Sequence, residues 1–458
     1  MKSTREQAEA FLQQHDQQHL LKFYDQLTPE SQEQLLDQIL SLDLDKVVSL
    51  FESTTALQEQ VEDDLVPIEA GDWESFSEEE KHRYEELGWE ALRSGRVGAI
   101  VVAGGQGSRL GHPGPKGTYN IGLPSGKSLF QLQAERLINL SGRAGRTIPW
   151  YIMTSPENHA ETVEAFQRAA YFGYPLDHLY FFEQSVLPAI DSEGKILLAE
   201  PGRISLAPAG NGDCFAAIKR SGALDDMKAR QIEWLFYYNV DNALVKVADP
   251  KFIGYTMDSQ APAACKVVPK SHPEEKVGIV CLNRGRPAVI EYSDLPRELM
   301  LAKNEQGNLL YDQANISMHL FHMDFVEKGA ELPLPYHAAH KKVAAIDEQG
   351  HPVTPSEPNA YKFERFIFDL FPLADKLAVL QVNRSEEFAP VKNKEGEDSP
   401  ETARSLVLEL HRKWLLEAGV GEERIANRTV EISPLTSYSG EGLHAEQVPD
   451  PTEKTLIL

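Results

Sequence analysis

An apolar, β-branched run at residues 97–103 passes directly into a loop that has glycine at three of the four positions 104–107. The run has the length of one buried strand, and glycine lets the backbone after it adopt conformations that a Cβ forbids. A buried strand that ends in such a loop is typical of an α/β sheet, in which backbone amides approach a ligand. Arg109 and Lys116 add positive charge, so the segment predicts a site for a nucleotide with a phosphate chain.

Two familiar nucleotide-binding motifs do not fit this loop. After Gly105 and Gly107 the third glycine is Gly111, one residue later than the dinucleotide fingerprint G-x-G-x-x-G requires. Residues 125 and 126 are Ser and Gly where the fingerprint places an acid for the ribose. Residues 122–128 read GLPSGKS, one residue short of a phosphate loop, and no strand leads into them. The motifs therefore argue against a dehydrogenase and against a P-loop ATPase.

Composition limits the partners of the chain. The 458 residues exceed one typical core, and 41% hydrophobic with 25% charged residues is ordinary for a globular protein. The net charge of −25 argues against nucleic acid or an anionic membrane as partner, and it also fits simple solubility. We find neither a signal-peptide pattern nor a membrane-spanning apolar run. Three scattered cysteines suggest no disulfide framework, so we expect a cytoplasmic protein.

The hydrophobic pattern divides the chain into three regions. Residues 1–95 have apolar side chains at helical spacing, and residues 384–458 read as a small C-terminal lobe with one helix at 402–418. Residues 96–383 alternate between strands and helices, which predicts a mainly parallel sheet covered on both faces. The strands are expected at 97–103, 148–154, 178–183, 234–240 and 263–268, the helices at 128–139 and 159–169, and a hairpin at 277–282 and 288–292.

The apolar strand at 234–240 ends abruptly in Asp241. Ligands collect at the carboxyl ends of strands in open α/β sheets, so Asp241 is expected to face the same crevice as the glycine loop. A carboxylate beside bound phosphates suits Mg²⁺, which takes one or two carboxylates together with substrate oxygens. The alternative is a turn or helix-capping residue, a role that Asp often fills after a strand.

Other segments carry weaker signals. A second glycine loop contains Gly210 and Asn211, which reads either as a simple turn or as a contact to a base or sugar. Gln184 follows an expected strand and has the donor and acceptor that a uracil edge requires, although such a residue is often only solvated. Glu291 and Tyr292 end the hairpin, where Glu291 is either a sugar ligand or an exposed carboxylate.

Two histidine pairs resemble metal motifs. His319 and His322 lie in a strand-like stretch, where a spacing of three puts their side chains on opposite faces. His337 and His340 follow two prolines in an expected loop. Neither pair is expected to bind a metal.

An ordered series of motifs resembles one family. The chain is similar to the UDP-sugar pyrophosphorylases, and most similar to the eukaryotic-type UDP-N-acetylhexosamine (UDP-N-acetylglucosamine) pyrophosphorylases. The motifs are AGGQGSRLG at 103–111, PKG at 115–117, LFQLQAERL at 129–137, PWYIMTS at 149–155, FEQ at 182–184, APAGNG at 207–212, NVDN at 239–242, EYSD at 291–294 and VKN at 391–393. Their order and spacing make the resemblance specific.

The resemblance implies a Rossmann-like, mainly parallel mixed sheet of the nucleotide-diphospho-sugar transferase type, with a helical N-terminal region and a small C-terminal lobe. It implies an enzyme that joins UTP and a sugar 1-phosphate, with Mg²⁺, to give a UDP-sugar and pyrophosphate. The implied roles are base and nucleotide binding by Gly104, Gly105, Gln184 and Gly210; phosphate contacts by Arg109, Lys116 and Lys392; sugar contacts by Asn211, Glu291, Tyr292 and Asn315; and a metal site at Asp241.

Two departures from the family pattern bear on the substrate. Ser108 stands where threonine is common, a mild change, and Asp213 stands where a glycine often follows Asn-Gly. A carboxylate at 213 would repel phosphate if it pointed inward, so we expect it to point out. N-acetylglucosamine 1-phosphate is the favoured substrate. A UDP-glucose or broad UDP-sugar pyrophosphorylase, and a non-catalytic UDP-sugar-binding protein, stay open as alternatives.

Overall fold

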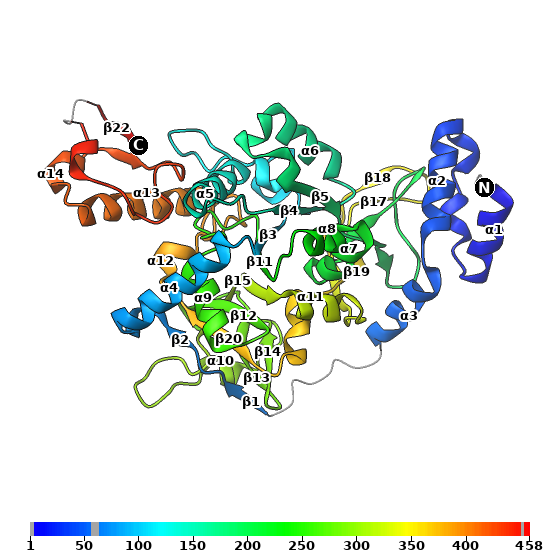
Figure 1. The fold of residues 1–458 in the computed structure, drawn as a ribbon. Helices are drawn as coiled ribbons and strands as arrows, with labels where there is room; N and C mark the ends of the chain where they lie inside the picture. Colours follow the sequence, from blue (N-terminus) through cyan, green and yellow to red (C-terminus); the bar gives the residue numbers. More distant parts are fainter. Residues whose placement is uncertain (1–3, 56–63, 450–452) are drawn as a thin grey trace. The chain divides into compact units, whose positions relative to one another are not determined.

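The computed structural model describes residues 4–55, 64–449 and 453–458, which Figure 1 traces as a ribbon. The chain forms two compact units. The first comprises Met1–Glu62, Gln184–Asp213 and Pro333–Asp369, and the second comprises Asp63–Glu183, Cys214–Leu332 and Leu370–Leu458. The two units are defined by compactness alone. They do not test the three regions expected from the sequence, which stay a prediction.

The second unit is built on a large sheet with helices around it. Its strands are β1 (Leu65–Pro67), β2 (Gly71–Asp72), β3 (Val97–Val102), β4 (Trp150–Thr154), β5 (Leu179–Glu183), β11 (Trp234–Asn239), β12 (Ala263–Pro269), β13 (Ile279–Asn283), β14 (Arg286–Ile290), β15 (Gln313–His322) and β20 (Leu377–Gln381). Its helices are α4 (Glu78–Arg93), α5 (Leu129–Ala144), α6 (His159–Arg168), α7 (Cys214–Ser221), α8 (Ala223–Ala229), α9 (Pro250–Ser259), α10 (Arg297–Leu301), α11 (Met323–Ala330) and α12 (Arg384–Glu387). The C-terminal part adds α13 (Pro400–Glu417), α14 (Glu422–Ile425) and the parallel pair β21 (Thr429–Glu431) and β22 (Thr455–Ile457).

The main path of the large sheet runs in the order β2-β20-β12-β15-β11-β3-β4-β5. Only β15 is antiparallel to its neighbours on this path, β11 and β12, and the other adjacent pairs are parallel. The antiparallel hairpin of β13 and β14 branches from β15, and β1 pairs with β13. The mainly parallel mixed sheet is confirmed. Residues 1–95 contain the expected helices, and between them β1 and β2 each add a short edge strand to this sheet, which the sequence did not predict.

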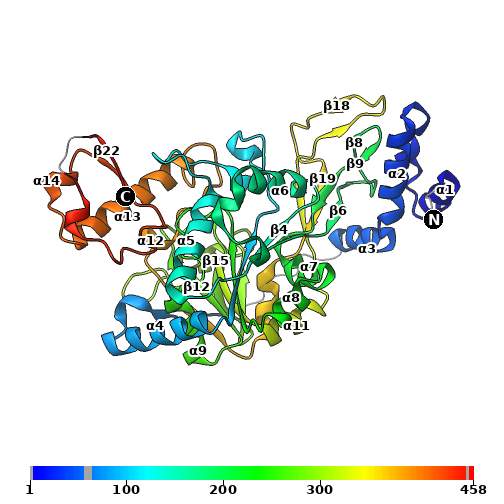
Figure 2. The ribbon, with the colours of Figure 1, turned by 45° about the horizontal axis from the view of Figure 1, so that its top comes forward.

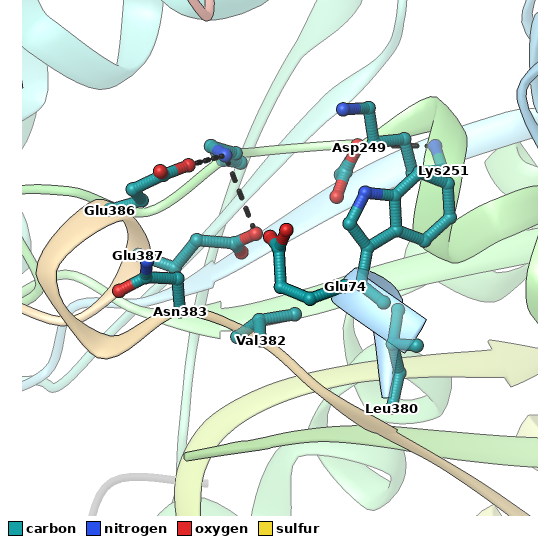
Figure 3. Close-up of a pocket in the computed structure, with 10 residues that line it drawn as sticks. Glu74, Asp249, Lys251, Leu380, Val382, Asn383, Glu386 and Glu387 are labelled. Carbon is teal, nitrogen blue, oxygen red and sulfur yellow. Dashed lines mark hydrogen bonds and ion pairs between the residues drawn. The ribbon is translucent and has the colours of Figure 1, made fainter. Parts of the chain in front are cut away.

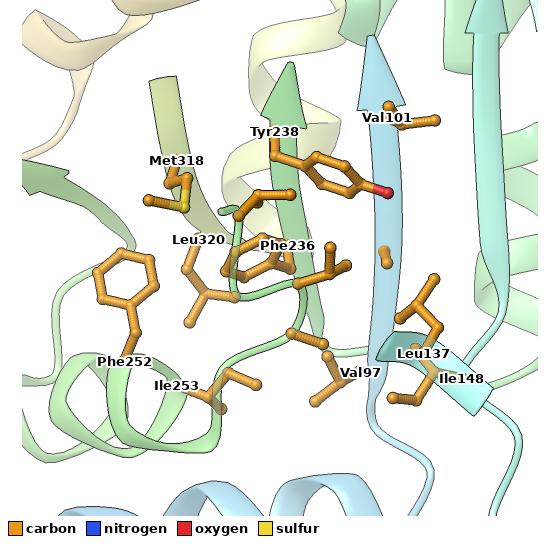
Figure 4. Close-up of a cluster of buried hydrophobic side chains, with 14 of the residues drawn as sticks. Val97, Val101, Leu137, Ile148, Phe236, Tyr238, Phe252, Ile253, Met318 and Leu320 are labelled. Carbon is orange, nitrogen blue, oxygen red and sulfur yellow. The ribbon is translucent and has the colours of Figure 1, made fainter. Parts of the chain in front are cut away.

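Alternation along β11 assigns the two faces of the sheet. Phe236 and Tyr238 point into the core shown in Figure 4, where they lie among side chains of β3, β15 and α9. The intervening Tyr237 points to the opposite face and lies against Phe321, which packs edge-on to Phe215 of α7. Both faces are therefore covered, as a strand apolar at every position requires. Figure 2 gives a second view of these helices around the sheet.

The first unit combines three helices with small sheets. Its helices are α1 (Arg5–Gln14), α2 (Pro29–Ser41) and α3 (Leu44–Thr55). Its strands are β6 (Val186–Pro188), β7 (Ile190–Asp191), β8 (Leu198–Glu200), β9 (Arg203–Ile204), β10 (Leu206–Pro208), β16 (His337–Lys341), β17 (Ala345–Ile346), β18 (Pro352–Val353) and β19 (Ala360–Glu364). Apolar side chains of the helices, such as Leu12, Leu35 and Ile39, pack with Ile190 and Phe363 of these strands. The expected loop at His337 is wrong, since this histidine begins β16, which pairs with β19.

No helix in the described ranges of the chain is long and apolar enough to cross a membrane.

Candidate active site

The backbone oxygens at the start of the glycine loop, directly after β3, all accept hydrogen bonds from the protein itself. Ser155 Oγ donates to the Gly104 oxygen at 2.9 Å, and Asn158 Nδ2 donates to the Ala103 oxygen at 2.9 Å. The backbone N–H of Lys116 donates to the Gly105 oxygen at 3.1 Å. By contrast, the N–H groups of Gly104 and Gly105 have no acceptor among the residues that the structure describes. The loop thus presents free donors at the carboxyl end of a parallel strand, where α/β sheets bind nucleotides.

Gly105 is a glycine that the protein's own packing does not explain. A Cβ built at this position meets no atom within 4 Å, and the backbone is not in the left-handed region. Gly107 differs, because a Cβ there would lie 2.7 Å from Cβ of His112. The open space beside Gly105 is therefore room for a ligand to approach the backbone closely.

Lys116 and Asp241 form an ion pair, with Lys116 Nζ 2.9 Å from Asp241 Oδ2. The pairing follows from topology, because β3 and β11 are parallel neighbours and both residues follow the carboxyl ends of these strands. Burial raises the pKa of the Asp241 carboxyl, but the ammonium groups of Lys116 and Lys392 outweigh burial, so the net pKa is lowered. The sequence prediction that Asp241 and the glycine loop share one edge of the sheet is confirmed.

Backbone contacts bring Lys392 to the same place. The N–H of Val391 donates to the backbone oxygen of Asp241 at 2.9 Å, which puts the next residue beside this carboxylate. Lys392 Nζ lies 3.1 Å from Asp398 Oδ2, and its N–H donates to the Asp398 oxygen. Asp398 was missed from the sequence, because a charge in an acidic loop carries no distinguishing signal.

Asn242 ties the segment before Lys392 to the end of β11. Its Nδ2 donates to the Glu387 oxygen at 2.6 Å, and its Oδ1 accepts the Ala389 N–H at 2.9 Å. The N–H of Ala243 also donates to the Ala389 oxygen. The second asparagine of the NVDN motif therefore positions a backbone segment rather than a ligand.

Behind this segment lies a buried cluster of charges, lining the pocket shown in Figure 3. Lys266 is fully buried, and its Nζ lies 2.5 Å from both Asp249 Oδ2 and Glu387 Oε2. Lys246 lies 3.5 Å from carboxylate oxygens of Glu386 and Glu387. Opposite charges in direct contact offset the large cost of burying each one. The one sequence signal for this cluster is Lys266 itself, a single charged residue within the otherwise apolar strand β12.

Arg109 takes no part in these ion pairs. It is exposed in the short 3₁₀ turn Ser108–Leu110, and its side chain has no ion-pair partner within the described ranges of the chain. Gly111 ends this turn in the left-handed conformation, with φ of 72°. An unpaired guanidinium close to the glycine loop is available for a phosphate group.

Two of the predicted sugar contacts come together around Gly278. The N–H of Asn315, in β15, donates to the Gly278 oxygen at 2.8 Å. A Cβ at Gly278 would lie 3.0 Å from Glu291 Oε1, so this carboxylate lies beside the same glycine. Tyr292 is 41% exposed. The structure brings Asn315 and Glu291 into one neighbourhood within the second unit.

Gln184, Gly210 and Asn211 belong to the first unit. Gln184 is buried, and its Oε1 has no hydrogen-bond partner among the described residues. Gly210 has φ of 87°, a region that favours glycine, and Asn211 Oδ1 accepts the Ile367 N–H at 2.9 Å. A buried amide oxygen without a partner is unusual and marks an acceptor that a ligand can satisfy.

The expectation that Asp213 points outward is wrong. Asp213 has no exposed surface, and its carboxylate is bonded to the guanidinium of Arg365 and to Ser185. The reason is charge compensation, since a buried carboxylate that is paired with a cation need not turn to solvent. Arg365 thus offsets the negative charge of Asp213 within the first unit.

Neither histidine pair is part of a cluster of metal-ligating side chains among the described residues. Burial lowers the pKa of His319 to about 3, and the ring lies among Tyr237, Phe321 and Phe371. In the described part of the chain, no three His, Cys, Asp or Glu side chains gather as a metal site. Asp241 alone still suits Mg²⁺, because this ion is often bound by one carboxylate together with substrate phosphates and water.

Comparison with known proteins agrees with this geometry. A family profile described as UTP–glucose-1-phosphate uridylyltransferase matches residues 49–439. UDP-N-acetylglucosamine diphosphorylase 2 of Arabidopsis thaliana is 40% identical over 95% of this chain and 90% of the relative. UDP-N-acetylglucosamine pyrophosphorylase of Saccharomyces cerevisiae is 41% identical over 83% of this chain and 82% of the relative. The solved structure of uridine diphosphate N-acetylglucosamine pyrophosphorylase from Trypanosoma brucei superposes with a TM-score of 0.85, at 29% identity, and covers 99% of this chain and 98% of that one.

A mainly parallel sheet with free loop amides and cations at one carboxyl edge defines a nucleotide-phosphate-binding α/β protein. Within that class, the chain belongs to the UTP–glucose-1-phosphate uridylyltransferase family.

Proposed function

We propose that this protein transfers the uridylyl group of UTP to N-acetylglucosamine 1-phosphate, giving UDP-N-acetylglucosamine and pyrophosphate. The observation that carries the proposal is the grouping of Lys116, Asp241 and Lys392 beside the free amides of Gly104 and Gly105. The choice of sugar rests on the relatives in Arabidopsis thaliana and Saccharomyces cerevisiae, both named for UDP-N-acetylglucosamine.

The proposed reaction needs charge stabilisation rather than a general base. A phosphate oxygen of the sugar 1-phosphate is already anionic, and it attacks the α-phosphorus of UTP in line with the departing oxygen. One P–O bond forms, the bond from the α-phosphorus to the bridging oxygen breaks, and the electron pair leaves with pyrophosphate. Lys116, Lys392 and Arg109 reduce the repulsion between the two anions and bind the leaving group. Arg109 offers planar, multiple contacts, whereas Lys116 is a compact point charge.

We propose that Asp241 holds Mg²⁺ together with oxygens of the substrate phosphates. When bound, Mg²⁺ would neutralise charge that develops on the phosphoryl oxygens. Lys116 Nζ lies 2.9 Å from Asp241 Oδ2. The lysine thus keeps the carboxylate ionised and oriented before substrate enters.

The remaining contacts are proposed by residue type. Gln184 Oε1, buried and without a partner among the described residues, would accept the N3–H of uracil, with Gly210 against the base. Glu291, Asn315 and Asn211 would bind sugar hydroxyl and acetamido groups, with Tyr292 at the sugar. The three cysteines form no disulfide, which supports a cytoplasmic location.

Positional labelling tests the reaction. UTP that carries label on the α-phosphate is expected to pass it to the nucleotide sugar, and label on the γ-phosphate is expected in pyrophosphate. Both transfers should require Mg²⁺ and N-acetylglucosamine 1-phosphate. Release of the γ-label as inorganic phosphate, or no turnover with any sugar 1-phosphate, would contradict the proposal.

A further inference from the structure

We propose that Asp213 is a positioning residue that holds the segments around Gln184 and Gly210 in the arrangement that binds the base of UTP. The inference rests on the proposed function, because it takes the base contacts of Gln184 and Gly210 from there. It goes beyond that function by assigning a role to a residue that departs from the family pattern. Its observations all lie within the first unit.

The carboxylate of Asp213 joins two chain segments that are distant in sequence. Oδ2 accepts hydrogen bonds from both the backbone N–H and the Oγ of Ser185, each at 2.6 Å. Oδ1 forms an ion pair with the guanidinium of Arg365. The side chain is fully buried, and hydrogen bonds to a buried charge are stronger than those between neutral groups. Asp213 therefore connects Ser185, which directly follows Gln184, to Arg365.

Backbone hydrogen bonds extend this connection to the second glycine loop. The N–H of Ala209 donates to the Ser185 oxygen at 2.9 Å, and the N–H of Arg365 donates to the Ala209 oxygen at 2.8 Å. The Arg365 oxygen in turn accepts the Gly212 N–H at 2.8 Å. Ala209 and Gly212, which lie on either side of Gly210, are thus hydrogen-bonded to the backbone of Arg365, the ion-pair partner of Asp213.

The backbone of Arg365 packs so closely against position 210 that only glycine fits there. A Cβ at position 210 would lie 2.4 Å from the Arg365 oxygen, so the two backbones are in direct contact. The aromatic ring of Tyr336 supports the other side of the arginine, with the guanidinium 4.8 Å from the ring centroid. The Arg365 side chain is therefore held between Asp213 and Tyr336, while its backbone shapes the loop.

The consequence for Gln184 follows from chain connectivity. The hydrogen bond from the Ser185 N–H restrains the peptide plane between residues 184 and 185, and so the position of the Gln184 Cα from which the side chain extends. The Oε1 atom of this side chain is buried with no partner among the described residues. An acceptor held ready in this way binds an N–H donor without first being ordered, which lowers the cost of binding.

Two variants test the proposal without leaving an unpaired buried charge. Ser185→Ala removes one donor to the carboxylate, and the double variant Asp213→Asn with Arg365→Gln replaces the ion pair by two neutral polar groups, of which Asn matches Asp in shape and Gln is shorter than Arg. Affinity for UMP is measured by calorimetry, and KM for UTP and for the sugar 1-phosphate by initial rates. We expect the affinity for UMP to fall and KM for UTP to rise, each about three- to tenfold, which is the worth of about one net hydrogen bond. The value of kcat should change less than about twofold, because none of the three mutated residues touches the reacting atoms.

Ile190→Ala is the matched control for loss of stability in the same unit. Ile190, in β7, is 1% exposed and belongs to the hydrophobic core of the first unit. It is not among the hydrogen-bond or ion-pair partners given above for Asp213. This control should lower the melting temperature without changing affinity for UMP. Unchanged UMP affinity in both test variants, or an equal loss in Ile190→Ala, would overturn the positioning role. Failure of the unmutated protein to turn over UTP would instead contradict the proposed function, and UMP binding would still test Asp213.

Discussion

The ammonium of Lys116 lies 2.9 Å from the carboxylate of Asp241, although 124 residues separate them in the sequence (241 − 116 − 1). The pair joins the carboxyl ends of two parallel neighbours, β3 and β11. A cation and a candidate metal ligand are thereby placed beside the free amides of the glycine loop.

Lys116→Ala is expected to lower kcat by about 10²–10³, similar to the loss of one electrostatic donor at a developing charge. The reason is that repulsion between two anionic substrates is then offset by fewer cations. Lys81→Ala is the control, since Lys81 forms an exposed i,i+3 ion pair with Glu78 on α4. Steady-state kinetics of both variants would refute the assignment if Lys116→Ala retained near-normal turnover.

Gly105→Ala separates ligand binding from folding. A Cβ at this position meets no protein atom within 4 Å, so the free energy of unfolding should stay unchanged. KM for UTP should rise by about tenfold or more, because the methyl group fills the space where a ligand approaches the backbone. Gly142→Ala on α5 is the control with equally open surroundings. It should raise the free energy of unfolding by about 0.5–1 kcal/mol and leave KM unaltered. Equal KM values for both variants would argue against a ligand at Gly105.

The pKa of Asp241 predicts a pH dependence of stability. Burial raises this pKa, but Lys116 and Lys392 lower it by more, so the folded value lies below the unfolded one. Between the two values the unfolded chain binds more protons, and stability therefore rises with pH in that window. The stability difference between the wild type and Asp241→Asn should be complete above about pH 4 and shrink as pH falls further. Urea unfolding from pH 3 to 7 measures it, with exposed Asp375→Asn as control. A difference that grows toward low pH would show that the sign is wrong.

The buried charge cluster predicts a large effect of a single lysine. Lys266→Met leaves Asp249 and Glu387 without their shared partner, and should lower the free energy of unfolding by about 3–5 kcal/mol. Lys251→Met, at the pocket that Asp249 and Glu387 also line, removes a half-exposed lysine 3.4 Å from Glu85 and should cost less than about 1 kcal/mol. Chemical denaturation compares the two. A similar loss in the free energy of unfolding for both variants would show that the stability of this cluster does not depend on Lys266.

Local patterns in the sequence sufficed for five strands of the large sheet, β3, β4, β5, β11 and β12, and for the edge at which the candidate site lies. The apolar runs of β3 and β11 and the glycines after β3 are short-range signals, and the rule for parallel sheets brings their ends together. The hairpin of β13 and β14 was also predicted, and Arg284 and Gly285 form its two-residue turn with positive φ.

Long-range compensation of charge could not be predicted in this way. Asp213 points inward because Arg365, 152 positions later, neutralises it. Lys266 is tolerated in an apolar strand because Asp249 and Glu387 come from other elements. The short strands β1 and β2 have too few residues for a recognisable period, and only their pairing with β13 and β20 defines them.

Competition between two sugar phosphates tests the central claim most directly. The protein is supplied with UTP, Mg²⁺ and equal amounts of N-acetylglucosamine 1-phosphate and glucose 1-phosphate, and both nucleotide sugars are quantified over time. We predict Mg²⁺-dependent release of pyrophosphate, with kcat/KM for N-acetylglucosamine 1-phosphate higher by about tenfold or more, the value of a few well-placed contacts. Absence of pyrophosphate release, or a preference for glucose 1-phosphate, would contradict the account.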